Sequence, residues 1–163
     1  MFKTEVFLPS PSTWEEIKNT IISLEHEAFG DKAFTDEEIS SDFLNEKNII
    51  VLLKKEETSE IVGFVYAKPV EEAEAERVAE KGETAYLWDI IIKQEYRGQH
   101  LAGILMNKIE EELKSMNYKY MDLCAVKENN FAENISKTYQ GRIVKSEPID
   151  SKWGPQVFFR IRL

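Results

Sequence analysis

The chain has 163 residues, of which 42% are hydrophobic and 31% are charged, and its formal net charge is −9 at pH 7. This balance is typical of one soluble folded domain over residues 1–163 and argues against disorder. The acidic charge and the lack of a sizeable basic patch argue against a nucleic-acid partner, and no apolar run reaches the roughly 18 residues that cross a bilayer. The N-terminal stretch lacks the apolar core of a secretory signal, and Cys124 is the only cysteine. We therefore expect a cytoplasmic protein without an internal disulfide.

The hydrophobic pattern predicts helices and strands in a definite order. In chain order, the predicted elements are helices at 13–29 and 35–44, strands at 48–54, 61–67 and 85–93, a long helix at 99–116, a strand at 120–126, a helix at 130–139, and strands at 143–145 and 157–163. Thr13 is the expected N-cap of the first helix, with Glu16 as its capping-box partner, and Thr35 is the expected N-cap of the second. The acidic stretch 71–83 predicts a solvated loop or a short exposed helix.

The strands predict a mixed sheet. The nearly continuous apolar run 85–93 is typical of a strand covered on both faces. The helix and the strand 120–126 that follow it make a β-α-β unit, whose two strands run parallel with a right-handed crossover. The hairpins on either side are antiparallel, so we expect an α/β fold with helices on both faces of the sheet. The last strand, 157–163, is a candidate for edge pairing with a second copy, which makes a homodimer one option.

A turn suited to phosphate follows the run 85–93. Gly98 permits a tight turn, and the residues from Gln99 to Gly103 are expected to open the long helix. The first backbone N–H groups of a helix have no intrahelical acceptor and lie at its positive end, where a phosphate or pyrophosphate binds well. Ala102 and Gly103 leave room for such a group, and Arg97 supplies a cation beside it. The alternative is an ordinary strand-to-helix loop without a ligand.

The stretch Arg97-Gly98-Gln99-His100-Leu101-Ala102 resembles the acyl-CoA signature of the GNAT superfamily of N-acyltransferases, Gln/Arg-x-x-Gly-x-Gly/Ala. The first and last positions match, whereas His100 stands at the middle glycine. The preceding LWDIIIKQEYRG is also similar to the family's strand and turn, with Gln94 where proline is usual. The resemblance covers residues 83–144 well and the first half only in element order. It implies a mostly antiparallel sheet of six to seven strands with one parallel pair, splayed to admit the acyl-CoA arm.

The resemblance implies acetyl-CoA as the cofactor. In this family the pyrophosphate lies on the N–H groups of the turn, the pantetheine arm pairs with the preceding strand, and a strand N–H polarises the acyl carbonyl. The N–H group of His100 can still serve if the residue is helical, while its side chain adds a contact or limits the approach of the cofactor. The cofactor-binding residues implied in this way are Ile90, Ile91, Ile92, Arg97, Gly98, Gln99, His100, Leu101, Ala102, Gly103, Asn129, Asn130 and Ser136.

Candidate acids and bases come from the same resemblance. The acceptor amine must be neutral when it attacks, and the departing thiolate takes up a proton. Asp89 interrupts an apolar strand where many relatives carry an acid, so it is either the base or a structural hydrogen-bond partner, and Glu83 is the second candidate base. Ser136 fills the family's usual tyrosine position, and Tyr139 lies one helical turn later. Either Tyr139 protonates the thiolate, or Ser136 only binds the cofactor, or no acid is needed.

The implied activity is an N-acetyltransferase that transfers an acetyl group from acetyl-CoA to a primary amine of a small molecule or a peptide. The alternative is a non-catalytic acyl-CoA-binding or sensing module, which the departures at His100 and Ser136 motivate. A dinucleotide-binding domain is disfavoured because Gly-x-Gly-x-x-Gly is absent. Two histidines without metal-ligand spacing predict no metal site. Glu25, Glu27 and the acidic stretch 71–83 are candidates for attracting a cationic amine.

Overall fold

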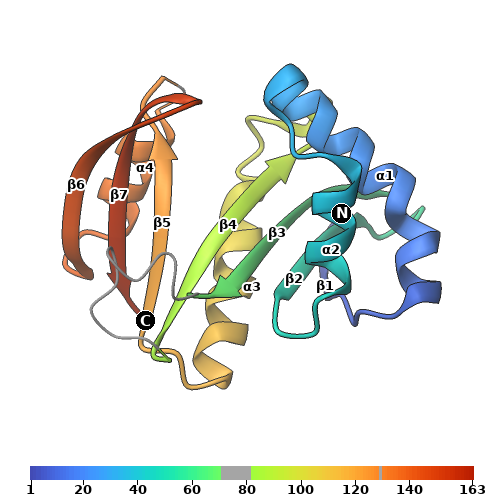
Figure 1. Ribbon diagram of the computed structural model, residues 1–163, viewed down its shortest axis with the longest axis horizontal. Helices are drawn as coiled ribbons and strands as arrows, with labels where there is room; N and C mark the ends of the chain where they lie inside the picture. The colour runs from blue at the N-terminus through green and yellow to red at the C-terminus, as the bar shows by residue number, and fades with distance from the viewer. Residues whose placement is uncertain (71–81, 129) are drawn as a thin grey trace. The chain divides into compact units, whose positions relative to one another are not determined.

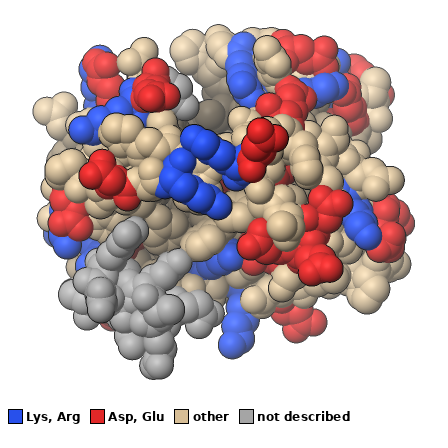
Figure 2. Space-filling view, turned by 45° about the horizontal axis from the view of Figure 1, so that its top comes forward, with Lys and Arg blue, Asp and Glu red and all other residues tan. Residues whose placement is uncertain are grey.

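The computed structural model describes residues 1–70, 82–128 and 130–163. Its main elements are β1 (Phe2–Val6), α1 (Pro11–Phe29), α2 (Asp36–Leu44), β2 (Ile49–Lys55), β3 (Ile61–Pro69), β4 (Thr84–Ile92), α3 (Leu101–Ser115), β5 (Tyr120–Val126), α4 (Phe131–Thr138), β6 (Ile143–Ser151) and β7 (Gly154–Arg162). No helix in this part of the chain has the length and apolar character needed to span a membrane. Acidic and basic side chains are interspersed on the face that Figure 2 shows, a mixed surface that fits the net charge of −9.

The strands form one mixed sheet, as the sequence predicts. Within the described ranges it has seven strands in the order β1-β2-β3-β4-β5-β7-β6 (Figure 1). The pair β4–β5 is parallel, with Thr84–Tyr86 opposite Tyr120–Asp122. The pairs β1–β2, β2–β3, β5–β7 and β6–β7 are antiparallel. The mostly antiparallel α/β sheet with one parallel pair is therefore confirmed.

The chain divides into two compact units. Unit 1 comprises residues 1–68 and 88–112, and unit 2 comprises residues 69–87 and 113–163. Unit 1 contains β1, α1, α2, β2, nearly all of β3, the second half of β4 and most of α3. Unit 2 contains the first half of β4 together with β5, α4, β6 and β7. The single domain over 1–163 and the splaying of β4 from β5 stay predictions.

Unit 1 has an aromatic core between α1, α2 and the strands. Phe43 of α2 is fully buried, and its ring centroid lies 5.0 Å from that of Trp14 and 5.5 Å from that of Phe64. All residues of β2 from Ile49 to Leu53 are buried, as expected for a strand covered on both faces. Each large apolar side chain buried here contributes about 1.5–3 kcal/mol, so this packing holds the strands and helices of unit 1 together.

The first helix begins earlier than predicted, and Thr13 is not its cap. Ser10 is the N-cap, because its Oγ accepts from the Thr13 N–H at 3.1 Å while Thr13 Oγ1 accepts from the Ser10 N–H at 3.0 Å. Pro11 follows at the first helical position, where a missing N–H costs nothing. Thr13 is therefore the capping-box partner, which the prediction assigned to Glu16. The predicted cap Thr35 is confirmed at the start of α2.

Three strands differ from their predictions. β1 was not predicted, yet it pairs with β2 along its whole length. β6 extends to Ser151 and β7 begins at Gly154, so both strands are longer than predicted and a tight hairpin joins them. β7 lies between β5 and β6. It therefore has no free edge for a second copy, and the homodimer stays a prediction without this support.

Candidate functional site

The turn after β4 belongs to unit 1 and differs from its prediction in one respect. The helix was expected to open at Gln99, but α3 begins at Leu101. Gly98 has a φ of 78° and His100 a φ of 60°, so both are left-handed. A left-handed residue cannot continue a right-handed helix, which is why His100 precedes α3. The histidine thus holds the backbone conformation that glycine adopts most easily, at the position where the GNAT signature has its middle glycine.

The turn leaves space for an anion. Gln99 and His100 are exposed, and a Cβ atom added at Gly98 or Gly103 would meet nothing within 4 Å. The first N–H groups of α3 point out of the helix, and consecutive N–H groups around left-handed residues form anion-binding concavities. The Arg97 Nε donates to the Ile92 carbonyl at 2.8 Å, which fixes the guanidinium beside the turn. These donors and this open space fit a pyrophosphate.

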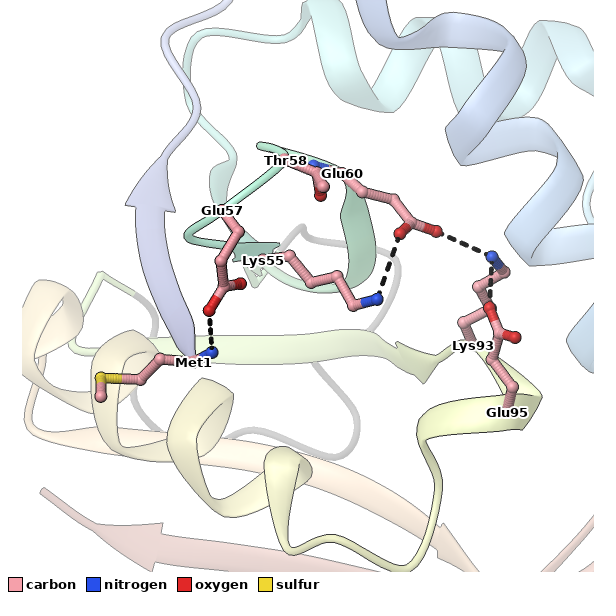
Figure 3. A network of polar contacts seen from close by, with 7 residues as sticks. All are labelled: Met1, Lys55, Glu57, Thr58, Glu60, Lys93 and Glu95. Carbon is pink, nitrogen blue, oxygen red and sulfur yellow. Dashed lines mark hydrogen bonds and ion pairs between the residues drawn. The ribbon is translucent and has the colours of Figure 1, made fainter.

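A polar network fixes the start of this turn. The Nζ of Lys93 lies 2.8 Å from Glu60 and 2.6 Å from Glu95, and Lys55 reaches the other oxygen of Glu60 at 3.7 Å (Figure 3). The hydrogen bond that Glu60 accepts from Lys93 lowers the pKa of the Glu60 carboxyl group. The Lys55 Nζ also lies 4.7 Å from the centroid of the Tyr96 ring. Such exposed pairs add about 0–1 kcal/mol each, so their main effect is to orient the turn relative to the β2–β3 hairpin.

The strand residues expected to hold the pantetheine arm lie directly before the turn. Ile91 is buried in the core of unit 1, whereas Ile90 and Ile92 are half-buried. Gly63 of β3 allows β4 to approach closely here, since an added Cβ would lie 2.6 Å from the Ile91 carbonyl oxygen. Pairing of this backbone with the cofactor stays a prediction.

Asp89 lies in a buried pair of carboxyl groups in unit 1. It is 7% exposed, and the carboxyl group that acts on it most strongly is that of Glu25 on α1, which is 1% exposed. The Phe34 N–H donates to Glu25 Oε1 at 3.1 Å. Burial is the main cause that raises the pKa of Asp89 well above its ordinary value, and the charge of Glu25 and the hydrogen bond to it raise it further. The sequence alone does not predict this pairing, although Glu25 follows Ile21 by four residues and so shares the apolar face of the helix.

A small acidic pocket lies in the same unit. It has a volume of about 330 Å³ and is lined by Phe34, Glu37, Glu38, Ser41, Asp42, Lys68 and Trp88. The Lys68 Nζ lies 2.7 Å from Asp42 and 3.9 Å from the centroid of the Trp88 ring. The Tyr66 hydroxyl donates to Asp42 at 3.0 Å, and burial raises the pKa of this phenol. With three acids and one base, the lining favours a cationic ligand.

Other predicted acids are engaged elsewhere. Glu83 in unit 2 is half-exposed and forms an ion pair with Lys119. Glu27 in unit 1 accepts from the Gln94 N–H at 2.6 Å, so its carboxylate supports the turn. Of the acidic stretch 71–83, residues 71–81 lie outside the described ranges, and a role of that stretch in attracting an amine stays a prediction.

The residues predicted to protonate the departing thiolate or to bind the pantetheine arm lie in unit 2. Tyr139 caps the C-terminal end of α4 and is 2% exposed, with the Arg142 guanidinium carbon 4.9 Å from its ring centroid. Ser136 is exposed on the same helix. Asn130 is the left-handed N-cap of α4, with a φ of 59°, whereas Asn129 lies outside the described residues. The roles of these four residues stay predictions.

The mixed sheet with one parallel pair and the turn after β4, which fits a pyrophosphate, agree with the fold and cofactor site that the sequence resemblance implies. The sequence comparison agrees, because a model of the Acetyltransferase (GNAT) family matches residues 14–135, well over half of the chain. The chain therefore belongs to the GNAT acetyltransferase family. No curated protein matches it in a direct sequence comparison.

Solved structures share the fold at low sequence identity. An N-acetyltransferase from Staphylococcus aureus has a TM-score of 0.72 and 13% identity, with 98% of each chain covered. The PaiA N-acetyltransferase from Thermoplasma acidophilum, in complex with coenzyme A, has a TM-score of 0.65 and 13% identity, with 99% of each chain covered. A GNAT family acetyltransferase from Elizabethkingia anophelis with acetyl-CoA bound has a TM-score of 0.63 and 15% identity, covering 99% of this chain and 98% of that one.

Proposed function

We propose that this protein is an N-acetyltransferase that binds acetyl-CoA at the turn from Arg97 to Gly103 and transfers the acetyl group to a primary amine of a small molecule or a peptide. The observation that carries the proposal is the backbone of this turn. His100 is left-handed, with a φ of 60°, a conformation that glycine adopts most easily, so this chain forms the turn without a glycine at that position of the signature. A cytoplasmic location belongs to the same proposal.

Several groups of unit 1 would hold the cofactor. The N–H groups from Gln99 to Ala102 and the guanidinium of Arg97 would bind the pyrophosphate, and the backbone of Ile90–Ile92 would hold the arm. The Gly103 N–H already donates to the His100 carbonyl at 3.1 Å, so Gly103 would contribute the open space beside the turn. Bound acetyl-CoA supplies an acetyl group activated as a thioester. The chain's own contribution is to fix the position of that group and to keep hydrogen-bond donors near its carbonyl oxygen.

We assign the base to Asp89. A primary amine is mostly protonated near neutral pH, so one proton must leave the ammonium group before the nitrogen attacks. Asp89 takes this proton, directly or through a water molecule, and later releases it to solvent. Glu83 is the less favoured base because its carboxylate is already ion-paired with Lys119. When the N–C bond forms and the C–S bond breaks, the second proton of the amine is lost to water and the thiolate gains a proton from water or from Tyr139, which water then reprotonates. One proton in all, the one that Asp89 takes, is left over to solvent.

Thiol release in the presence of amines tests this proposal. The protein is incubated with acetyl-CoA and a panel of polyamines, amino acids, aminoglycosides and peptides, and free thiol and product mass are measured. We expect amine-dependent thiol release that Asp89→Asn lowers by about 100-fold or more in kcat/KM. Asp31→Asn, an exposed position of the same unit, is the matched control and should leave it unchanged. Equal activity of Asp89→Asn and the wild type would contradict the assignment of the base.

The second candidate function is a non-catalytic acyl-CoA-binding module. Two observations favour it: Ser136 stands at the position of the family's tyrosine, and the nearby Tyr139 is buried beneath Arg142. Binding of acetyl-CoA without thiol release for any amine of the panel would support this alternative. Transfer to a single amine would exclude it.

A further inference from the structure

We propose that Glu25 and Asp89 share one proton in the folded protein, and that Glu25 is a positioning residue that sets the pH at which Asp89 acts as a base. Glu25 lies on α1 and Asp89 on β4, and both belong to unit 1. The first part of the proposal concerns the folded protein alone. The second part rests on the proposed function, in which Asp89 takes a proton from the acceptor amine.

The geometry of the pair requires a proton. Asp89 Oδ2 is fully buried, and no hydrogen-bond donor among the described residues reaches it. The side chain that does contact Asp89 is another carboxyl group, that of Glu25. Two ionised carboxylates accept hydrogen bonds but donate none, so they repel each other when they are buried together. A single proton on either group turns this contact into an O–H···O hydrogen bond and removes one buried charge.

The remaining contacts of the pair do not replace that proton. The Phe34 N–H donates to Glu25 Oε1, and the backbone of Ile90 lowers the pKa of Asp89 in opposition to the larger effects of burial and of Glu25. These contacts orient the two carboxyl groups and stabilise one negative charge between them. They supply no cation, so the pair is suited to a net charge of −1.

Charged groups of the neighbouring elements are engaged with one another. The Tyr66 hydroxyl on β3 points to Asp42 on α2 at 3.0 Å, and Lys68 on β3 lies 2.7 Å from the same carboxyl group. Lys68 is thus paired with Asp42 and lies over the Trp88 ring, and among the described residues no cation is one of the groups that shift the pKa of Asp89. Lys68 does not neutralise the second charge of the pair.

The pair gives Asp89 a protonation equilibrium closer to neutral pH than that of an isolated aspartate. When the shared proton leaves, both carboxyl groups are ionised, and this form takes up a proton readily. A base is most effective when it ionises near the operating pH, since it is then both unprotonated and able to accept a proton. During the reaction the ammonium group loses a proton, the pair regains the proton that it had lost, and solvent removes it again. Because the two groups are coupled, the ionisation belongs to the pair.

The first experiment uses the protein without cofactor or amine. Carboxyl carbons of Asp and Glu are labelled with ¹³C and titrated by NMR, and Asp89→Asn identifies the signal of Asp89. We expect the wild-type signal to titrate well above the ordinary range of aspartate. In Glu25→Gln it should move down by about one pH unit or more, because the neutral amide removes the like charge and donates to the carboxylate. Glu16→Gln, the same change at an exposed position of α1, should leave the signal unmoved.

The second experiment measures the pH dependence of kcat/KM with an amine that the wild type acetylates. The acid limb should move to lower pH in Glu25→Gln by the same amount as the NMR signal, whereas a structural role of Glu25 would lower the rate equally at all pH values. An Asp89 signal at the ordinary position in the wild type overturns the shared proton, even if Glu25→Gln does not fold. A shifted signal with an unmoved acid limb overturns the positioning role. A wild type that titrates as expected and acetylates nothing supports the pair and contradicts the proposed function instead.

Discussion

At the scale of single residues, His100 carries the departure from the family signature that matters most. The structure places it at a φ of 60°, a conformation that costs a residue with a Cβ roughly 1–2 kcal/mol. The protein tolerates this cost at a turn whose residues from Arg97 to His100 are exposed. Strain of this kind is often retained where the backbone serves a ligand. The histidine therefore preserves the shape of the turn and alters only what projects from it.

Replacing His100 tests this interpretation. We expect His100→Gly to raise the free energy of unfolding by about 1 kcal/mol, since glycine adopts the left-handed conformation without strain, and to preserve acetyl-CoA binding. His100→Val should lower both the free energy of unfolding and the affinity for acetyl-CoA, because a β-branched residue is strained in this conformation. Ser59→Gly, at a φ of 59° in another turn, is the control that should change stability alone. Urea denaturation and calorimetric titration measure the two quantities. Weaker acetyl-CoA binding by His100→Gly would show that the imidazole itself binds the cofactor.

The carboxyl pair predicts a pH dependence of stability. The pKa of Asp89 in the folded protein is raised above its unfolded value of about 3.9, so the folded state binds more protons between these two pKa values. The free energy of unfolding should therefore fall as the pH rises through the folded pKa, by up to about 1.4 kcal/mol per pH unit. Glu25→Gln should remove the part of this fall that the Glu25 charge causes, while the part that burial causes remains.

Urea denaturation of the wild type and of Glu25→Gln, each at about pH 5 and at about pH 8, measures the effect. The difference in free energy of unfolding between the two proteins should change by about 1 kcal/mol or more from one pH to the other. Other titrating groups contribute equally to both proteins and cancel in this comparison. Glu16→Gln should follow the wild type at both pH values. Parallel stabilities of Glu25→Gln and the wild type would contradict a shared proton.

The sequence predicts part of this residue-scale account. Asp89 interrupts an apolar strand, so burial with a partner or a raised pKa follows from the strand pattern alone. The identity of the partner does not follow, because Glu25 lies on a helix far away in the chain and only the packing of α1 on the sheet brings the two together. The left-handed conformation of His100 was not predicted either, since histidine, unlike glycine, carries no strong local signal for it.

At the scale of elements, the start of α3 is the feature on which cofactor binding depends. Gly103 lies in its first turn, has an ordinary helical conformation, and has open space where a Cβ would stand. Neither packing nor backbone conformation in the described structure therefore requires a glycine here. A pyrophosphate bound closely against this turn, as proposed, would require a glycine at this position.

The substitution Gly103→Ala separates the effect of this residue on stability from its effect on acetyl-CoA binding. Alanine is the better helix former, so the free energy of unfolding should rise by about 0.5–1 kcal/mol. The added methyl group should weaken acetyl-CoA binding about tenfold, which corresponds to about 1.4 kcal/mol. Asn107→Ala, at an exposed position of the same helix, should raise stability without a change in affinity. Unchanged affinity in Gly103→Ala would mean that the cofactor does not lie against this turn.

Most elements were predicted, and the errors have identifiable causes. Strands and helices with long apolar patterns, such as α3 and β5, match closely, and the left-handed Asn117, with a φ of 66°, follows the predicted end of the long helix at 116. β1 was missed because its five residues alternate between half-buried and exposed, and only pairing with β2 makes it a strand. The length of β6 was missed because its residues are mostly exposed and include Pro148, which an edge strand tolerates.

At the scale of the whole molecule, unit 2 depends on one buried ion pair. Asp122 of β5 is fully buried, and its two oxygens accept from Nε and Nη2 of Arg160 on β7, each at 2.9 Å. The two residues lie opposite each other in the β5–β7 pair. A bidentate pair of this kind fixes the register of two strands, although removing one partner leaves a buried charge without compensation.

Arg160→Met should lower the free energy of unfolding by about 3–5 kcal/mol, because the Asp122 carboxylate stays buried and loses its cation. The double variant Asp122→Leu with Arg160→Met removes both charges and should recover most of this loss. Lys145→Met, which removes an exposed ion pair with Glu147, should cost less than about 1 kcal/mol. Chemical denaturation of the three variants measures these differences. A double variant no more stable than Arg160→Met would contradict the account of the pair.

The central claim concerns the whole protein: the turn from Arg97 to Gly103 binds acetyl-CoA. The most direct test is a thermal-shift titration with acetyl-CoA, run beside CoA, ATP and NAD on the same preparation. A ligand at about one hundred times its dissociation constant stabilises the folded state by about 2.7 kcal/mol. We expect a selective rise of Tm with acetyl-CoA and CoA that Gly103→Ala reduces. A folded protein whose Tm does not respond to any CoA species would contradict the cofactor site, and with it the assignment of Asp89 as the base.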